Sequence, residues 1–113
     1  MDEKRWRVLI SSDVMRGFHD LLILSLLDER DSYGYEIGKE IKFRSEDVYK
    51  LKETTLYSAF ARLEKNGWIF SYDTQETHGR KRVNYTITSD GRQEFKRRKE
   101  EWSLIKNLMR QFI

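Results

Sequence analysis

Apolar residues between positions 14 and 66 recur every three or four residues, which is the period of an α-helix buried on one side. The pattern predicts three helices, at Val14–Glu29, Tyr33–Phe43 and Glu53–Asn66. Side chains that accept hydrogen bonds from free helical amides precede the first two: Ser12 or Asp13, and Asp31 or Ser32. The third helix is expected to stop at Gly67, because glycine readily adopts the left-handed conformation of a helix C-terminus. The polar segment 44–52 is expected to connect the second and third helices.

After Gly67 the period changes to two, which predicts strands. Two runs show this alternation: Trp68, Phe70 and Tyr72 with Ile69, Ser71 and Asp73, then Val83, Tyr85 and Ile87 with Asn84, Thr86 and Thr88. The segment between the runs contains Gly79 and three consecutive cations, Arg80, Lys81 and Arg82. We therefore expect a β-hairpin with a basic tip.

A last helix is expected to begin at Ser89, Asp90 and Gly91 and to run almost to the C-terminus. Its wide apolar stripe is formed by Phe95, Trp102, Ile105, Met109 and Phe112, with Leu104 and Leu108 beside them. The first predicted helix is also apolar on most of its sides. Because so short a chain has little surface left to cover both helices, we expect a second copy to cover them in a homodimer.

Three helices, a two-stranded hairpin and a long helix, in this order, predict a winged helix-turn-helix with a C-terminal dimerisation helix. The fold class is mainly α with a small β-hairpin. Within this one compact domain we expect an N-terminal arm over residues 1–13, the winged-helix region over 14–88 and the dimerisation helix over 89–113. Trp6, Val8, Leu9 and Ile10 would pack the arm on the body.

The composition excludes several kinds of chemistry. The chain of 113 residues has no cysteine, so it has no disulfide, no thiolate nucleophile and no cysteine-containing metal site. His19 and His78 have no helical histidine partner, so we expect no metal site, with His19 an interior or interface residue and His78 a wing residue. Carboxylates lie in charge-dense segments that we expect to be exposed, which gives no support for acid–base catalysis. We expect no catalytic residues and no cofactor.

Neither a membrane span nor a secretion signal is predicted. The longest apolar stretch, Leu21–Leu27, is too short to cross a bilayer, and the first residues are charged. The expected location is the cytoplasm, with no membrane partner. The net charge of +3 is compatible with nucleic acid but does not require it.

The third predicted helix and the hairpin together favour double-stranded DNA as the partner. The outer side of this helix carries Thr55, Ser58, Arg62 and Lys65, whose hydroxyl and cationic groups reach bases and phosphates. The cations of the hairpin tip would lie along the adjacent backbone or in the minor groove. Either feature alone is typical of a solvated helix face or a soluble loop, so the inference depends on their arrangement.

Several motifs resemble the PadR family of bacterial transcriptional regulators. They are Asp31-Ser32-Tyr33-Gly34-Tyr35-Glu36-Ile37, Thr54-Thr55-Leu56-Tyr57, Ala61-Arg62-Leu63-Glu64-Lys65-Asn66-Gly67, and Gly79-Arg80-Lys81-Arg82 leading into Tyr85-Thr86-Ile87-Thr88 and Gly91. The resemblance extends from about Asp13 to the C-terminus and is greatest to the short subfamily, which has one C-terminal helix.

The resemblance implies a cytoplasmic homodimeric repressor that binds a palindromic operator. It implies DNA contacts by Thr54, Thr55 and Tyr57 and by the basic wing, and a contact of Tyr33 with the DNA backbone. We expect bases to be read from Thr54 to Ser58, and Arg62, Lys65 and the wing to hold phosphates. The residues expected at the dimer interface or an effector site are Val14, Phe18, Leu21, Phe95, Trp102, Ile105 and Met109.

Two interpretations of Trp102 are open: it lines a pocket for a planar aromatic effector, as in some multidrug-sensing members of the family, or it packs in the dimer core. Arg98 and the bulky Phe18 and Leu21 are departures from an open apolar pore. Two alternatives to DNA binding are also open, namely a winged helix used for protein–protein contact and a ligand-binding dimer without DNA function.

Overall fold

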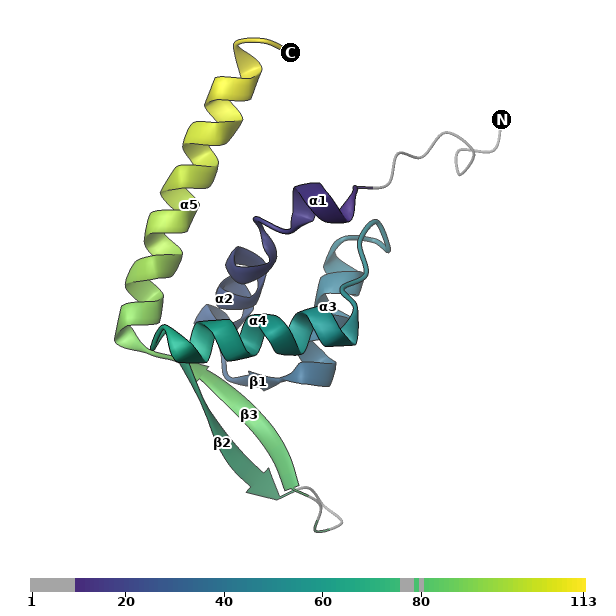
Figure 1. The fold of residues 1–113 in the computed structure, drawn as a ribbon, viewed down its shortest axis with the longest axis vertical. Helices are drawn as coiled ribbons and strands as arrows, with labels where there is room; N and C mark the ends of the chain where they lie inside the picture. The colour runs from purple at the N-terminus through teal and green to yellow at the C-terminus, as the bar shows by residue number, and fades with distance from the viewer. Residues whose placement is uncertain (1–9, 76–78, 80) are drawn as a thin grey trace, which may run out of the picture.

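The computed structural model describes residues 10–75, 79 and 81–113. Its elements are α1 (Ser12–Met15), α2 (His19–Glu29), β1 (Ser32–Tyr33), α3 (Gly34–Arg44), α4 (Glu53–Lys65), β2 (Ile69–Gln75), β3 (Lys81–Ile87) and α5 (Ser89–Arg110). Helices α2, α3 and α4 form the body, and the β2–β3 hairpin extends from one side of it (Figure 1). Helix α5 begins at the root of the hairpin, runs in the opposite direction and contacts α2. The predicted winged helix-turn-helix with a long C-terminal helix is confirmed.

The predicted single helix at 14–29 is wrong, because the structure divides it into α1 and α2 at residues 16–18. The amide of Phe18 donates to the carbonyl of Met15 at 2.8 Å and closes a turn at the end of α1. Gly17 lies in this turn, where a residue without Cβ favours departure from the helix. The apolar spacing continues through residues 16–18, so this spacing gave no indication of the break between α1 and α2. Ser11, one residue before the expected caps, is the N-cap of α1.

The start of α3 also differs from the prediction, because residues 32–33 form a short strand instead of a cap. Ser32 pairs with Tyr85 of β3, and the carboxylate of Asp31 accepts a hydrogen bond from the Tyr72 hydroxyl at 2.6 Å. Tyr33, in extended conformation, occupies the N-cap position and caps nothing with its side chain. Within the described residues the sheet therefore has three antiparallel strands, in the order β1-β3-β2.

The core lies between the three body helices and the near end of the sheet. Ile23, Leu24 and Leu27 of α2 are buried in it, as are Ile37 and Ile41 of α3, Leu56, Phe60 and Leu63 of α4, and Ile69, Tyr85 and Ile87 of the sheet. The rings of Phe60 and Tyr85 stack with centroids 4.2 Å apart, which joins α4 to the root of the hairpin. The core thus fixes the position of the hairpin relative to α4.

Glycines 67 and 91 allow the close passage from α4 to the hairpin and from the hairpin to α5. Gly67 follows α4 with φ +75°, which confirms the predicted left-handed helix end. At Gly91 a Cβ would lie 2.0 Å from the carbonyl oxygen of Trp68, so the first turn of α5 packs directly on the backbone of the hairpin. The hydroxyl of Thr88 secures this junction by donating to the Gly67 carbonyl at 2.7 Å and accepting from the Gly91 amide.

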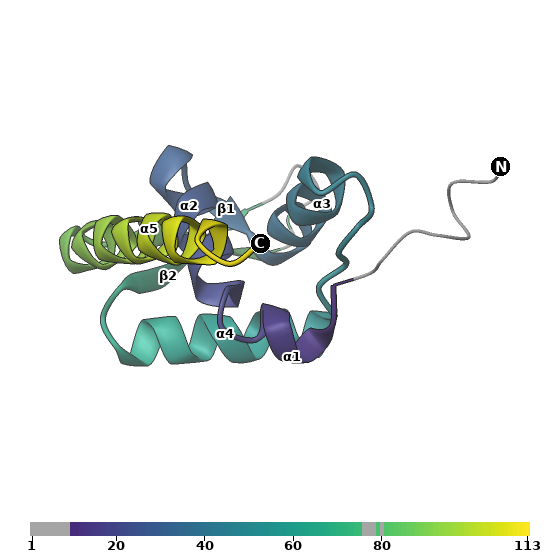
Figure 2. The same cartoon turned by 90° about the horizontal axis from the view of Figure 1, so that it is seen from above.

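The far half of α5 extends beyond the rest of the chain (Figures 1 and 2). Phe95, in its first half, packs against the core, whereas Leu104 is 70% exposed and Leu108 58% exposed. The apolar stripe predicted for this helix is therefore divided, with one end packed against the core and the other end uncovered.

Candidate nucleic-acid interface

The outward face of α4 is a stripe of small and polar side chains. Thr54, Ser58, Ala61 and Lys65 are all exposed, and their spacing of four, three and four residues places them on one side of the helix. The opposite side is buried through Leu56, Phe60 and Leu63. The stripe offers hydroxyls, a methyl group and an ammonium group, which are groups that can contact base edges and phosphates. Ala61 was not among the predicted contacts, although its spacing from Thr54 and Ser58 indicates it.

Two predicted contact residues lie on one flank of α4 instead of on this stripe. Thr55 is half-buried and lines a groove between α4 and α1. Arg62 donates from Nη2 and Nε to the carboxylate of Asp20 on α2, at 2.5 and 3.2 Å. This hydrogen bonding to Asp20 raises the pKa of the Arg62 guanidinium. Arg62 therefore has an intramolecular anionic partner, which the sequence did not indicate.

Asp20 is the centre of a charge network that joins three helices. Its side chain is 10% exposed, and Arg98 of α5 lies 3.7 Å from it. Glu94, one turn earlier on α5, accepts hydrogen bonds from Arg97 and Arg98. These arginines, Arg97 first, lower the pKa of Glu94 to about 2. The expectation that the carboxylates are exposed is wrong at Asp20, and its position inside an apolar segment was the signal for a buried acid.

His19 is buried in the same region, as predicted for an interior residue. Its Nε2 lies 2.7 Å from the hydroxyl of Tyr49, and the two rings stack with centroids 5.7 Å apart. Burial lowers the pKa of His19 from 6.5 and so favours its neutral form. Tyr49 belongs to the connector between α3 and α4, so this pair fixes the chain just before α4 begins.

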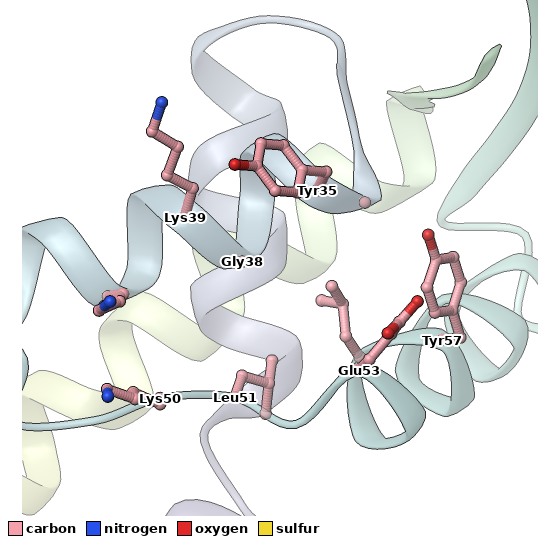
Figure 3. Close-up of a pocket in the computed structure, with 10 residues that line it drawn as sticks. Tyr35, Gly38, Lys39, Lys50, Leu51, Glu53 and Tyr57 are labelled. Carbon is pink, nitrogen blue, oxygen red and sulfur yellow. The ribbon is translucent and has the colours of Figure 1, made fainter.

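Tyr57 lies on the other flank of α4 and faces α3 across a groove (Figure 3). It is 46% exposed, and its ring meets Phe60 edge-on at 5.6 Å. Its hydroxyl passes so close to Gly34 that a Cβ there would lie 2.5 Å from it. The Gly34 backbone thus sets the position of a predicted DNA contact.

The wing carries its cations next to β1. The guanidinium carbon of Arg82 lies 3.8 Å from the ring centroid of Tyr33, so a cation–π contact joins two predicted DNA contacts from separate strands. Lys81, at the start of β3, is exposed. Arg80 and His78 lie outside the described residues.

The residues expected at a dimer or effector site are spread along α5 and over α1 and α2, and α5 contacts α2. Trp102 is 42% exposed and meets Phe18 edge-on, with ring centroids 5.6 Å apart in the same chain. The other members range from half-buried to exposed: Leu21 and Ile105 are half-buried, and Val14 and Met109 are exposed. Phe95 contacts the core, and Lys99 lies over its ring. Arg98 is directed to Asp20 and to the ring of Trp68.

Within the described residues, no helix is long and apolar enough to span a bilayer. In the same part of the chain, no group of three or more histidine and acidic side chains is placed to hold a metal ion.

Comparisons with known proteins identify the family of this chain. The model of the transcriptional regulator PadR-like family matches residues 23–97. A transcriptional regulator from Clostridium thermocellum has a similar structure, with 54% identity and a TM-score of 0.86 over 93% of this chain and 99% of that one. A PadR family transcription regulator from Clostridium difficile is 39% identical with a TM-score of 0.73, covering 84% and 97% of the two chains.

A relative from Lysinibacillus sphaericus, an uncharacterized protein, is 40% identical over 93% of this chain and 96% of its own length. The family model covers α3, α4, the hairpin and the first part of α5. This chain belongs to the PadR-like family of transcriptional regulators.

Proposed function

We propose that this protein is a homodimeric repressor whose two subunits place α4 in successive major grooves of a palindromic operator. The observation that carries the proposal is the exposed stripe of Thr54, Ser58, Ala61 and Lys65, with the Tyr33–Arg82 contact of the wing beside it. Thr54, Ser58 and Ala61 of the stripe read base edges, and Lys65 and the wing cations hold phosphates. The protein acts in the cytoplasm, where its operator is, and carries out no chemical reaction.

The dimer is supported by the uncovered end of α5. Leu104, Leu108 and Phe112 are 70%, 58% and 77% exposed in the single chain. Apolar side chains gathered at this density on one helix indicate a protein partner. A second copy satisfies this surface by placing its own α5 against it, and the resulting twofold axis matches a palindromic site.

We further propose that a planar aromatic effector relieves repression by binding beside Trp102. The support is the exposed indole of Trp102 with Phe18 at its edge, since aromatic rings stack on aromatic ligands. Addition of planar aromatics should quench the tryptophan fluorescence of the wild type more than that of Trp102→Phe. This variant is needed because the chain also contains Trp6 and Trp68. Equal quenching in both proteins would place the ligand elsewhere and reject this part of the proposal.

Footprinting on the DNA upstream of the protein's own gene tests the main proposal. We expect two protected half-sites about one or two helical turns apart. The variant with Arg80, Lys81 and Arg82 all changed to Ala should bind every sequence more weakly, whereas Thr54→Ala and Ser58→Ala should alter the preference among operator sequences. An unaltered affinity and salt dependence in the triple variant would reject the role of the wing.

Two outcomes would support other functions. A dimer that fails to shift this DNA at low salt would favour a winged helix used for protein–protein contact. A dimer that binds planar aromatics with the Trp102-dependent quenching described above, but binds no DNA, would favour a ligand-binding protein.

A further inference from the structure

Helix α4 lies between two grooves lined by basic side chains. The α3 groove, between α3 and the first turns of α4, has a volume of about 440 Å³ and contains Lys39, Lys42 and Lys50 (Figure 3). The α1 groove lies on the opposite flank, between α1, the connector and α4, and contains Arg16, Lys50 and Lys52. Lys50 lies in the connector just before α4, where it lines both grooves.

The lysines of these grooves and Arg16 are available to an external anion, whereas Arg62, which also lines the α1 groove, is bound to Asp20. Lys39, Lys42, Lys50 and Lys52 are exposed and make no ion pair with any residue that the structure describes. Arg16 pairs with Asp13 at 2.9 Å, but both side chains are more than 70% exposed, so this pair holds Arg16 only weakly. Arginines elsewhere on the body are held by carboxylates, as Arg44 is by Glu29.

Carboxylates are scarce in both grooves. Among the described residues that line the α3 groove, Glu53 is the one acid, and those that line the α1 groove include none. His19 also lines the α1 groove, where burial lowers its pKa and so disfavours a positive charge on its ring. Each groove therefore carries excess positive charge at neutral pH.

The two grooves lie on opposite sides of the stripe that faces outward from α4. Tyr57 faces the α3 groove, and Thr55 and Arg62 face the α1 groove. In Figure 1 the wing and β1 are on one side of α4, and α1 is on the other. A major groove about 12 Å wide is bordered by one phosphate backbone on each side, so a helix inserted in it has a backbone along each flank.

We propose that the α3 groove and the α1 groove each hold one of the two phosphate backbones that border the major groove entered by α4. This inference rests on the proposed DNA-binding function and extends it to Arg16, Lys39, Lys42, Lys50 and Lys52. Lysine suits this role, because its ammonium is a point charge on a flexible stem and does not demand one phosphate geometry. The wing secures the DNA on the α3 side, and the α1 groove supplies the contact to the second strand.

The salt dependence of binding to a mixed-sequence DNA duplex tests the proposal without knowledge of the operator. The two test variants are Lys39→Ala with Lys42→Ala, and Arg16→Ala with Lys52→Ala. Removal of each phosphate contact should reduce the slope of log K against log salt by about 0.9 for each bound subunit. The matched control is Lys96→Ala with Lys106→Ala on α5, which removes the same charge from exposed positions. A loss of slope confined to the two test variants supports the proposal, and equal loss in the control overturns it.

The absence of native cysteine allows a second test, of which strand each groove contacts. Lys42→Cys and Lys52→Cys, each carrying a tethered iron chelate, should cleave opposite strands of the footprinted operator fragment on either side of the same major groove. Lys106→Cys with the same reagent gives the background cleavage. Cleavage of one strand by both variants, or cleavage no greater than background, would overturn the two-backbone arrangement.

The failures of the two proposals are distinguishable. If the wild-type protein binds no duplex at low salt, the DNA-binding function itself is rejected. If the wild type binds and the wing variant is weakened, but neither groove variant alters the slope, only the present inference is rejected. Thermal unfolding of each variant verifies its fold, because substitution of these exposed side chains should leave the unfolding temperature unchanged.

Discussion

Arg62 of α4 and Asp20 of α2 form a two-point contact, with Nη2–Oδ1 and Nε–Oδ2 distances of 2.5 and 3.2 Å. The same carboxylate lies 3.7 Å from Arg98 of α5. One acid therefore contacts both the helix that is proposed to face DNA and the helix whose far end is proposed to dimerise. Sequence alone assigned Arg62 to phosphate, but the structure gives it a position set from inside the protein.

Replacement of Asp20 by Ala should destabilise the fold by about 1–3 kcal/mol, because charged hydrogen bonds to a nearly buried carboxylate are lost. Urea unfolding of Asp20→Ala, Arg62→Ala and the double variant measures the coupling between the two residues. Asp28→Ala is the matched control, since its pair with Arg92 is more exposed and should contribute less than about 1 kcal/mol. Additive effects of the Asp20 and Arg62 changes would show that the contact contributes nothing.

Gly91→Ala should destabilise the protein by about 1–3 kcal/mol, the usual cost of overpacking. The new Cβ would meet the Trp68 carbonyl oxygen at 2.0 Å and Ile87 at 2.8 Å, and backbone cannot move aside as a side-chain end can. Gly17→Ala is the control, because nothing lies within 4 Å of its added Cβ. Chemical unfolding should therefore give a lower free energy of unfolding for Gly91→Ala than for Gly17→Ala. Equal values would show that the start of α5 is not fixed on the hairpin.

Acidification should weaken the fold through Glu94. Its pKa is lowered from 4.5 to about 2 by Arg97 and then Arg98, so the folded state binds fewer protons than the unfolded state in this interval. The stabilisation is complete above pH 4.5 and is lost as the pH falls toward 2. The unfolding free energy of Glu94→Gln should accordingly fall less across this interval than that of the wild type. The exposed Glu100→Gln change on the same helix is the control, and it should reproduce the wild-type profile.

The contact between Tyr33 and Arg82 predicts a difference between two substitutions at Tyr33. Phe retains the ring that lies under the Arg82 guanidinium, whereas Ala removes the ring and with it this cation–π contact. We expect DNA affinity close to wild type for Tyr33→Phe and a reduction of about threefold to tenfold for Tyr33→Ala, the equivalent of roughly 0.5–1.5 kcal/mol. Gel shift measures both. Equal loss in the two variants would instead assign the effect to the Tyr33 hydroxyl.

Paired charges on α5 should dissociate the proposed dimer. Leu104→Glu with Leu108→Glu places carboxylates on the exposed apolar end of α5. Dimer formation would bury these charges without a cationic partner, which costs free energy. Sedimentation at micromolar concentration should then detect monomers. Ser103→Glu with Asn107→Glu adds the same charge to neighbouring exposed positions and should leave the dimer intact. A wild-type protein that is already monomeric would reject the dimer.

The order and type of most elements could be predicted from sequence because each carries its own period and punctuation. Helices α3, α4 and α5 agree within a residue or two with the apolar spacing, and the alternation after Gly67 indicates both strands of the hairpin. These signals are local, since they arise from which side of one segment must be buried. Strand β1 escaped prediction because two residues are too few to show a period.

The direction of individual side chains was decided by tertiary contacts between segments far apart in the sequence. Residues 20 and 62 are brought together by the packing of α2 against α4, and no pattern within either helix specifies this contact. The α3 and α1 grooves on the two flanks of α4 are likewise lined by side chains from segments far apart in the sequence. The sequence thus determined that a helix with one polar side is followed by a basic hairpin. The core determined which of their side chains face outward, because a helix exposes only the positions that its neighbours leave uncovered.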